Sequence, residues 1–505
     1  MELLNVSNLS SNPLFLSVIL LLSLSIWLKL AKGRNLNLPP SPPKLPIIGN
    51  IHQLGKLPHR SLRDLSNKYG SLLLLRLGYN PTLVVSAVDM AREIVKSHDI
   101  VFSDRPRTTA VNHLFYESKG MGFTPYGEYW RQVRKMSVVE LLSHQRVHSF
   151  QFVRDEEIGA VINKIRCASL KGEPVNLTKM LTFVSSNIVS RCILSHKNDE
   201  EDGCSKFGEL VRRLLILFTG FCIGDMFPYL RWVDVLTGYI PSMKALSAEL
   251  DAFFDQVINE HRAVETGAEV THKKDFVSII MQLLKDGMFE NLTQDNIKAI
   301  LLDMFLGGTD TTISTSEWML AELLKHPNAM KRVQQEVRNV VGNKSKVAPE
   351  DIPKMEYFKC VVKETLRLHP PFVFLHRKTS ASVKLGGYDI PSNTSVLINV
   401  WAIHMDPEWW EKPDEFIPER FENTSIDFEG QAFHYVPFGI GRRVCPGLSF
   451  GVSSVEHVMA NLLYLFDWKL PAGETAEKMD MTELYGLASS KKTPLHALPI
   501  PHSSF

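Results

Sequence analysis

The residues best suited to chemistry stand in one short segment, residues 437–447, which reads Pro-Phe-Gly-Ile-Gly-Arg-Arg-Val-Cys-Pro-Gly. Its cysteine offers a thiolate, which is a strong electron donor to iron. The glycines let the backbone approach a flat macrocycle and take positive φ, and the second arginine can hold a carboxylate through paired charge-assisted bonds. The phenylalanine can pack over the sulfur and exclude water. The segment therefore predicts iron bound by a thiolate, and its specified positions are Phe438, Gly441, Arg443, Cys445 and Gly447.

The other cysteines have no such context. The chain has six cysteines without a Cys-x-x-Cys pair, which is not the pattern of a disulfide scaffold or a zinc knuckle. We expect reduced cytosolic thiols, each an inert small hydrophobe. These are Cys167, Cys192, Cys204, Cys222 and Cys360.

A second segment, Gly307 to Thr312, reads Gly-Gly-Thr-Asp-Thr-Thr and lies within a long amphipathic stretch. Two adjacent glycines inside a helix cost about 1 kcal/mol each, so a purpose is implied. A local opening of the helix would give a small molecule room, and threonine hydroxyls that bond backwards would distort the ladder. The alternative is a helix that ends at the glycines, with Asp310 and Thr311 capping the next one. The segment alone favours that alternative.

Two further pairs have helical spacing. Glu364 and Arg367 are three residues apart, and Trp130 and Arg134 are four apart, so each pair shares a helix face. Taken singly, the first pair is typical of a solvated surface bridge and the second of a packed helix face. Neither pair on its own indicates a functional site.

Together and in this order, the segments resemble the motifs of the cytochrome P-450 superfamily. Residues 437–447 match its haem loop, Phe-x-x-Gly-x-Arg-x-Cys-x-Gly, and residues 307–312 resemble its oxygen-activation stretch, which in plant members more often begins with Ala. Residues 364–367 resemble its Glu-x-x-Arg, and residues 418–421 its partner motif. The resemblance spans essentially the whole chain, and in detail it is to plant microsomal members of the A-type group.

The resemblance implies a role for each matched residue. Cys445 would bind the iron of haem b, and Asp310 and Thr311 would supply protons and a hydrogen bond during O2 activation. A buried ion network would support the haem loop. Breaking such a network leaves an unpaired buried charge, which lowers the stability of the fold by about 3 to 5 kcal/mol. Its members are Glu364, Arg367 and Arg420. The residues that contact the haem, some at its propionates, would be Trp130, Arg134, Arg377, Phe438, Gly441, Arg443 and Gly447.

The fold implied is mainly α with a small β-region, the P-450 prism fold, preceded by one N-terminal transmembrane helix. The activity implied is a haem-dependent monooxygenase that acts on a small apolar plant metabolite, such as a terpenoid, phenylpropanoid, alkaloid or aldoxime. Near Arg377 the chain departs from the family pattern, because His376 replaces a proline. The resemblance therefore does not determine the local backbone or the pocket wall there. By position, the walls of the pocket would come from residues 106–123, 214–227, 301–311, 371–375 and 484–488. Their bulky members, each equally suited to plain core, are Phe115, Phe123, Phe305, Phe372 and Phe374.

Electrons must come from another protein, because no Gly-x-Gly-x-x-Gly fingerprint follows a predicted strand. The family's donor is a membrane-bound NADPH-cytochrome reductase with two flavins. An acidic reductase could dock on basic residues near the thiolate face, although some of these would face propionates instead. The candidates are Arg131, Arg134, Lys135, Arg442 and Arg443.

The N-terminus predicts a membrane anchor, because residues 3–28 carry no charge and are long enough, as a helix, to cross about 30 Å of hydrocarbon. Lys29, Lys32 and Arg34 follow directly, which places the body in the cytosol. A cleaved secretory signal would need basic residues first and a small-residue cleavage site, and neither is present. We therefore predict a single-pass membrane protein with an anchor at 1–30, a basic, proline-rich hinge at 31–50 and a body at 51–505. The resemblance implies that the membrane is that of the endoplasmic reticulum and that the body is a haem-thiolate catalytic domain.

The pattern of the body is mainly helical. A hairpin is expected over residues 72–77 and 82–86, and more strands over 383–385, 388–390 and 396–399. A helix of about thirty residues is expected from Thr293 to His326. Residues 214–223 are expected to form a buried helix rather than a membrane-dipping entrance. With 56 Lys and Arg against 55 Asp and Glu, no charge excess points to nucleic acid.

Two other functions compete with oxygen insertion. One is a haem-thiolate isomerase or dehydratase that needs neither O2 nor a reductase, and turnover without NADPH would identify it. The other is a non-catalytic haem sensor or electron carrier, which needs no large apolar pocket or proton relay. A substrate-induced change in the haem spectrum would separate an enzyme from these carriers.

Overall fold

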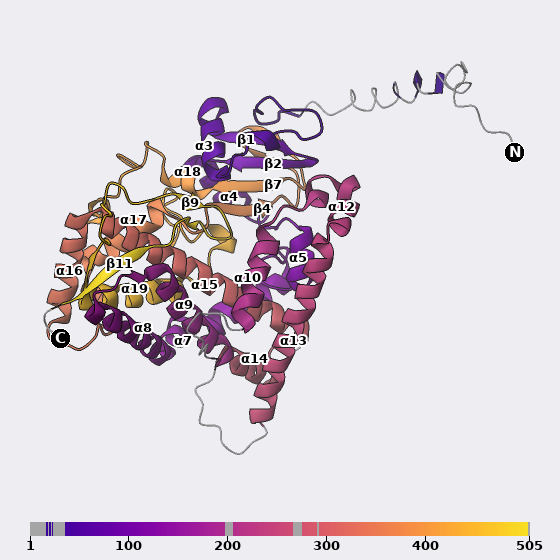
Figure 1. Cartoon of the computed structure of the whole chain (residues 1–505). Coiled ribbons are helices and arrows are strands. Elements are labelled where there is room, and N and C mark those ends of the chain that lie inside the picture. Colours follow the sequence, from indigo (N-terminus) through magenta and orange to yellow (C-terminus); the bar gives the residue numbers. More distant parts are fainter. Residues whose placement is uncertain are drawn as a thin grey trace.

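The computed structural model describes residues 17, 18, 20, 21, 23, 36–196, 206–265, 275–289 and 292–502. This part is mainly helical, with one four-stranded sheet and three smaller ones (Figure 1). The expected anchor at residues 3–28 lies almost entirely outside the described residues. Among those that are described, no helix has both the length and the apolar character needed to span a bilayer.

The four-stranded sheet forms around the predicted hairpin. β1 (Leu72–Leu77) and β2 (Asn80–Val85) pair antiparallel, so the hairpin prediction is confirmed, with the second strand starting two residues earlier than expected. β7 (Ser395–Asn399) pairs parallel to β2, and β4 (Phe374–Lys378) pairs antiparallel to β7. The sheet lies at the top of the view in Figure 1, and helices fill most of the rest of the molecule.

The smaller sheets are short ribbons. β5 (Val383–Leu385) and β6 (Tyr388–Ile390) confirm the other predicted strands. The turn between them has φ of +55° at Gly386 and +81° at Gly387, a tight turn that favours glycine at both positions. The remaining strands are β3 (Val175–Asn176), β8 (Phe466–Lys469), β9 (Glu483–Leu484), β10 (Ser490–Lys491) and β11 (His496–Pro501).

The predicted long helix is α15 (Gln294–Lys325), which runs through the main core. It begins with a capping box between Thr293 and Asn296, and it ends just before Pro327 opens α16 (Pro327–Val341). Most of its side chains are buried on all sides, because it packs against helices from both halves of the chain. Its main partners are α9 (Leu177–Leu194), α17 (Glu356–Leu368) and α19 (Leu448–Leu465).

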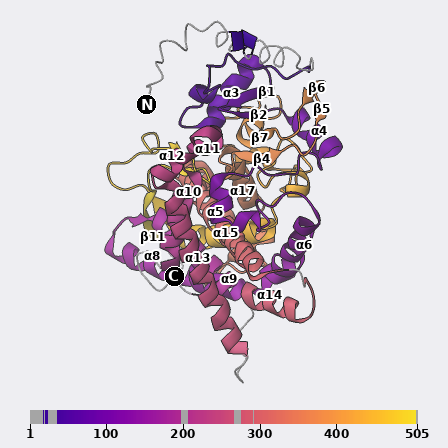
Figure 2. The same ribbon diagram turned by 90° about the vertical axis from the view of Figure 1, so that its right-hand side faces the viewer.

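Three helices, α5 (Thr109–Leu114), α10 (Lys206–Thr219) and α13 (Tyr239–Glu265), pack together along one flank (Figures 1 and 2). The other helices surround the core and the sheet. They are α3 (Pro58–Tyr69), α4 (Val88–His98), α6 (Glu128–Met136), α7 (His144–Ser149), α8 (Gln151–Lys171), α11 (Ile223–Met226), α12 (Arg231–Leu236), α14 (Phe276–Lys285) and α18 (Val400–His404).

The expected buried helix over residues 214–223 is wrong in its extent and in part of its burial. α10 ends at Thr219, and Leu214 is buried, but Ile216 and Phe221 are 57% and 58% exposed. Hydropathy alone does not show which apolar side chains a tertiary neighbour covers. The end of α10 therefore presents apolar side chains at the surface.

Candidate functional site

The cysteine segment forms a tight loop between the turn η7 (Gly441–Arg443) and α19. The Cys445 backbone N–H donates to the Phe438 carbonyl at 2.9 Å, which folds the loop back on itself. Gly441 has φ +68°, in the region that side chains disfavour. A Cβ at Gly441 would also lie 2.7 Å from Asp99 Oδ1, so the loop requires glycine there.

The Cys445 thiol is enclosed by protein yet retains exposed surface, as a side chain that faces an internal space does. Burial raises the pKa of the thiol, while the Gly447 N–H and the charge of Arg134 act to lower it. A metal cation bound at the sulfur would ionise the thiol. A Cβ added at Gly447 would lie 3.9 Å from the sulfur, an ordinary van der Waals distance, so Gly447 packs directly beside the thiol.

Four other cysteines lie within the described residues, and each is a free thiol. Cys192, Cys222 and Cys360 are buried, and burial raises the pKa of the Cys192 thiol to about 12. Such thiols stay protonated and unreactive. Cys167 is exposed, and Cys204 lies outside the described residues.

Four arginines gather beside the cysteine loop: Arg105, Arg134, Arg377 and Arg443. Burial, and then the charges of the neighbouring arginines, hold the pKa of Arg377 well below its usual value and lower that of Arg443 to about 9. Arg377 Nη2 donates to the Ile440 carbonyl at 2.9 Å, whereas Nη1 is buried without a partner among the described residues. Buried positive charge of this density needs anions, and the two propionates of a haem would supply them. The residues present therefore fit a haem whose iron Cys445 would bind.

Arg105 is absent from the set predicted by the resemblance. Its Nε donates to the Gly122 carbonyl at 3.0 Å, its Nη1 donates to the His376 carbonyl, and burial lowers its pKa to about 10. No local motif marks this arginine, because its partners come from distant parts of the chain. His376, which replaces a proline of the family pattern, accepts this bond from Arg105 through its carbonyl, and desolvation lowers the pKa of its ring to about 4, so the ring is neutral.

Trp130 and Arg443 are held by backbone carbonyls in this structure. The Trp130 indole N–H, its only donor, bonds the Met121 carbonyl at 3.1 Å. Arg443 donates to the carbonyls of Ser103 at 2.8 Å, Met121 at 3.1 Å and Thr124, and its guanidinium carbon lies 4.4 Å from the centre of the Trp130 ring. The contact of Trp130 with a propionate thus stays a prediction.

The glycine-threonine segment stays α-helical, so neither a helix end nor a local opening at Gly307 is found. The predicted backward bonds are present: the Thr311 hydroxyl donates to the Gly307 carbonyl at 2.7 Å, and the Thr312 hydroxyl to the Gly308 carbonyl at 2.8 Å. These hydroxyls add a second hydrogen bond to carbonyls that keep their helical ones, which explains why the helix does not break. A Cβ at Gly307 would meet no atom within 4 Å, so open space lies beside the helix there.

Asp310 and Thr311 both retain surface on α15. Burial raises the pKa of Asp310 to about 6, so this carboxyl can hold or release a proton close to neutral pH. The arrangement suits proton transfer at an inner surface.

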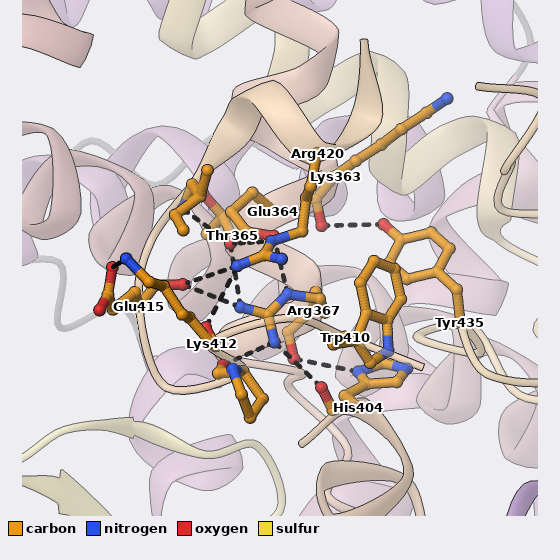
Figure 3. Close-up of polar contacts among 12 residues, drawn as sticks. Lys363, Glu364, Thr365, Arg367, His404, Trp410, Lys412, Glu415, Arg420 and Tyr435 are labelled. Carbon is orange, nitrogen blue, oxygen red and sulfur yellow. Dashed lines mark hydrogen bonds and ion pairs between the residues drawn. The ribbon is translucent and has the colours of Figure 1, made fainter. Parts of the chain in front are cut away.

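The predicted ion partners lie together and are buried (Figure 3). Glu364 accepts hydrogen bonds from Arg367 at 2.7 and 2.9 Å and from Arg420 at 3.0 Å. The side chains of Glu364 and Arg367 are fully buried. The arginines also donate to backbone carbonyls of residues 404, 411, 412, 413 and 415, so the network fixes this stretch to α17.

Two side chains connect the network to the cysteine loop (Figure 3). The Val436 backbone N–H donates to His404 Nε2 at 2.9 Å, so the ring proton lies on Nδ1. This Nδ1–H bonds the Arg367 carbonyl at 3.1 Å. The Tyr435 hydroxyl donates to the Lys363 carbonyl at 3.0 Å. The two residues that enter the loop are thus tied to α17. No sequence motif indicates His404, because a single buried histidine is more often plain core.

Replacing His404 with alanine is expected to loosen the cysteine loop. The change leaves the Val436 N–H and the Arg367 carbonyl buried without partners, at about 1 to 3 kcal/mol for each group. Burial and the charge of Arg367 lower the pKa of His404 from 6.5 to about 3, so the unfolded state binds its proton more readily. The wild type should therefore lose stability as the pH falls below 6.5.

The measurement is haem retention on gel filtration and thermal unfolding at pH 7 and pH 5. His404→Gln, which keeps an acceptor for Val436, should lie between alanine and wild type. Equal haem retention in all three proteins would show that His404 does not hold the loop.

Several aromatic side chains come from the segments that are predicted to form the pocket walls. Phe115, Phe123 and Phe218 pack in one cluster, with ring centres 4.8 to 5.5 Å apart. Phe305 instead packs edge-on against Phe207 at 4.5 Å, so it belongs to the core between α15 and α10. Of the remaining two, Phe374 is buried and Phe372 is 36% exposed.

Comparison with known proteins agrees with this site. A family model described as Cytochrome P450 matches residues 39–497. A phenylacetaldehyde oxime monooxygenase of Prunus mume is 49% identical over 98% of this chain and 97% of its own length. Cytochrome P450 71A1 of Persea americana is 49% identical over 90% of this chain and 92% of its own length.

A further relative is the desmethylyatein synthase of Sinopodophyllum hexandrum, 48% identical over 93% of this chain and 94% of its own length. The structure of a zebra fish cytochrome P450 with progesterone has a TM-score of 0.76 at 23% identity, over 88% of this chain and 99% of that one. The same fold is thus shared at low identity. Given a family match over nearly the whole length and plant relatives at close to half identity, the chain belongs to the cytochrome P450 family, as a haem-thiolate monooxygenase that carries haem b.

Proposed function

We propose that this enzyme inserts one atom of O2 into a small hydrophobic plant specialised metabolite. An R–H bond is replaced by R–O–H, and the second oxygen atom leaves as water. NADPH supplies two electrons and one proton as it becomes NADP+, and a second proton comes from the solvent. Bound haem supplies the activation of O2. The observation that carries the proposal is Asp310 beside Thr311 on α15, since an acid with a pKa of about 6 at an inner surface can relay protons.

As a first substrate we infer an aromatic aldoxime. The relative from Prunus mume named for phenylacetaldehyde oxime is 49% identical over 98% of this chain. The cluster of Phe115, Phe123 and Phe218 offers apolar and aromatic surface, which suits a phenyl ring. Terpenoids, phenylpropanoids and alkaloids are the other classes to be tested.

The electron donor in this proposal is a membrane-bound NADPH-cytochrome reductase. Arg131 and Lys135 are exposed on α6, which also carries Arg134 of the arginine cluster. Arg442 is half-exposed and pairs loosely with Asp99 at 3.7 Å. An acidic protein could bind these exposed cations on the side of the cysteine loop.

The membrane attachment in this proposal combines the anchor at residues 3–28 with an apolar surface on the body, at the endoplasmic reticulum with the catalytic domain in the cytosol. Ile47 is 75% exposed, and Tyr229 is 80% exposed. Tyr79 lies between the chain near Ile47 and Tyr229. The Gly78 N–H donates to the Ile48 carbonyl, and the Tyr79 ring packs 5.8 Å from that of Tyr229. Exposed apolar side chains in such number are typical of contact with lipid. Others in the same two parts of the chain are Leu36, Leu38, Leu45, Leu230, Trp232, Val235 and Leu236.

The test is expression of the full chain with a plant reductase and incubation with phenylacetaldehyde oxime and one compound of each other class. We expect a substrate-induced change in the haem spectrum and a product that requires both NADPH and O2. A product formed without NADPH would indicate an isomerase or dehydratase instead. Intact haem with no spectral response to any compound would favour a sensor or electron carrier.

Replacing Asp310 with asparagine is expected to lower kcat by about 10²-fold, within the usual contribution of a proton-transfer group. Because burial raises the pKa of Asp310 from 3.8 to about 6, the folded state binds that proton more tightly than the unfolded state. The wild type should lose stability as the pH rises from about 4 to 6, and the variant should lack this loss. Turnover and thermal unfolding over that range measure both effects.

The control is Asp295→Asn, near the exposed start of the same helix. It should leave kcat unchanged. A kcat for Asp310→Asn equal to that of wild type, with the same haem content, would exclude Asp310 from proton delivery.

A further inference from the structure

Asp303 has no part in the chemistry proposed above, although it lies on the same helix as Asp310. Seven residues separate the two carboxylates, which places them on one stripe of α15, about 10 Å apart along the axis. Asp303 is enclosed by protein and retains some exposed surface. Burial raises its pKa to about 6, while backbone N–H groups and the charge of Arg105 act to lower it.

The backbone groups that contact the Asp303 carboxylate belong to one short segment, residues 120–122. The Gly122 N–H donates to Asp303 Oδ2 at 2.9 Å, and the Met121 N–H lies close enough to the carboxylate to help lower its pKa. A Cβ at Gly120 would collide with the carboxylate, and one at Gly122 would lie 3.3 Å from Oδ1. The two glycines therefore allow the backbone to approach the acid closely.

The same segment is held from its other side by the haem site. The Met121 carbonyl accepts hydrogen bonds from Trp130 Nε1 and from Arg443 Nη1, each at 3.1 Å. At the surface, Lys119 forms an ion pair with Asp295 of α15 at 2.6 Å. Residues 120–122 thus lie between Asp303 and the arginine of the cysteine loop, next to the aromatic cluster of Phe123.

We propose that Asp303 is a positioning residue that clamps residues 120–122 against α15 and thereby sets the size of the substrate space. The clamp stands on the contacts alone, and its effect on the substrate space rests on the proposed function. The carboxylate accepts the Gly122 N–H, a backbone donor that would otherwise be unpaired inside the protein, and lies beside the Met121 N–H. Loss of the acid should free the segment to move toward or away from the helix.

The first test is amide hydrogen exchange on the holoenzyme. Asp303→Ala is expected to speed exchange at the Met121 and Gly122 amides about tenfold or more, as for loss of a charged hydrogen-bond partner. Asp303→Asn, which keeps one acceptor oxygen, should have a smaller effect. Asp295→Asn removes the surface ion pair to Lys119, the residue before this segment, and should leave these two amides unchanged.

Gly120→Ala breaks the same contact from the opposite side. In the wild type the new methyl group collides with the carboxylate, so exchange at Met121 and Gly122 should rise as it does in Asp303→Ala. In the Asp303→Ala background the collision is gone, so Gly120→Ala should add little. Unchanged exchange in Asp303→Ala, or fully additive effects in the double variant, would overturn the clamp.

The second test measures the substrate space without turnover. Imidazole and 4-phenylimidazole bind haem iron and report their Kd through the haem spectrum. In Asp303→Ala the ratio of the two Kd values should change about fivefold or more. The reason is that the pocket contacts of one small apolar group change the affinity of a ligand by about 10-fold. Asp295→Asn should keep the wild-type ratio. Faster exchange with an unchanged ratio would leave the clamp in place and overturn its role in the substrate space, and neither readout depends on the substrate proposed above.

Discussion

Replacing Cys445 with serine is expected to abolish thiolate ligation of the haem and to lower turnover by at least about 10³-fold, as for removal of an essential catalytic group. A serine hydroxyl does not ionise near neutral pH and is a much weaker electron donor than a thiolate. The bond from the Cys445 N–H to the Phe438 carbonyl involves backbone atoms only, so the loop should keep its fold. The measurement is the carbon monoxide difference spectrum of the purified variant, with its haem content and thermal unfolding.

A matched control is Cys360→Ser, the same substitution at another buried free thiol. Its hydroxyl enters an apolar site and costs some stability, but the carbon monoxide spectrum should stay that of the wild type. An unchanged spectrum in Cys445→Ser would show that another residue binds the iron. The contrast between the two variants separates iron binding from the general cost of a buried serine.

The sequence was sufficient to predict the cysteine loop because its chemistry is local. Gly441 and Cys445 stand in one contiguous segment, and the positive φ of Gly441 follows from that segment alone. The long helix α15 could be predicted equally well. Its capping box at Thr293 marks the start of the helix, and Pro327 marks its end. Local signals fix such elements before any tertiary contact forms.

The sequence did not predict the residues whose roles depend on contacts with distant parts of the chain. His404 bonds Val436 and Arg367, and Asp303 bonds Gly122, across separations that no local pattern encodes. The predicted opening of α15 failed for a related reason. Whether a hydroxyl breaks a helix or only adds a second bond to a carbonyl depends on how tightly neighbouring helices hold the backbone.

Replacing Glu364 with alanine is expected to prevent accumulation of the folded haem protein. The change leaves Arg367 and Arg420 buried without their carboxylate, which lowers the free energy of unfolding by about 3 to 5 kcal/mol. Total stability of a protein is about 5 to 15 kcal/mol, so this loss is a large fraction of it. The measurement is the yield of soluble, haem-loaded protein and its free energy of unfolding.

Glu422→Ala is the matched control, because it removes a carboxylate two residues after Arg420 in the chain, from an exposed pair with Arg332. Side chains in that pair are 49% and 33% exposed, and water can replace the lost partner. The expected cost is about 0 to 1 kcal/mol. Similar losses in the two variants would show that the network of Glu364 is no more than a surface ion pair.

A milder change separates the stability of the network from its hold on the loop. Glu364→Gln keeps an oxygen that can accept from an arginine but removes the charge, so part of the fold should survive. Since His404 and Tyr435 transmit the position of α17 to the loop, haem loss should accelerate at temperatures well below global unfolding. If haem loss and unfolding instead coincide in this variant, the network stabilises the domain as a whole and does not position Cys445.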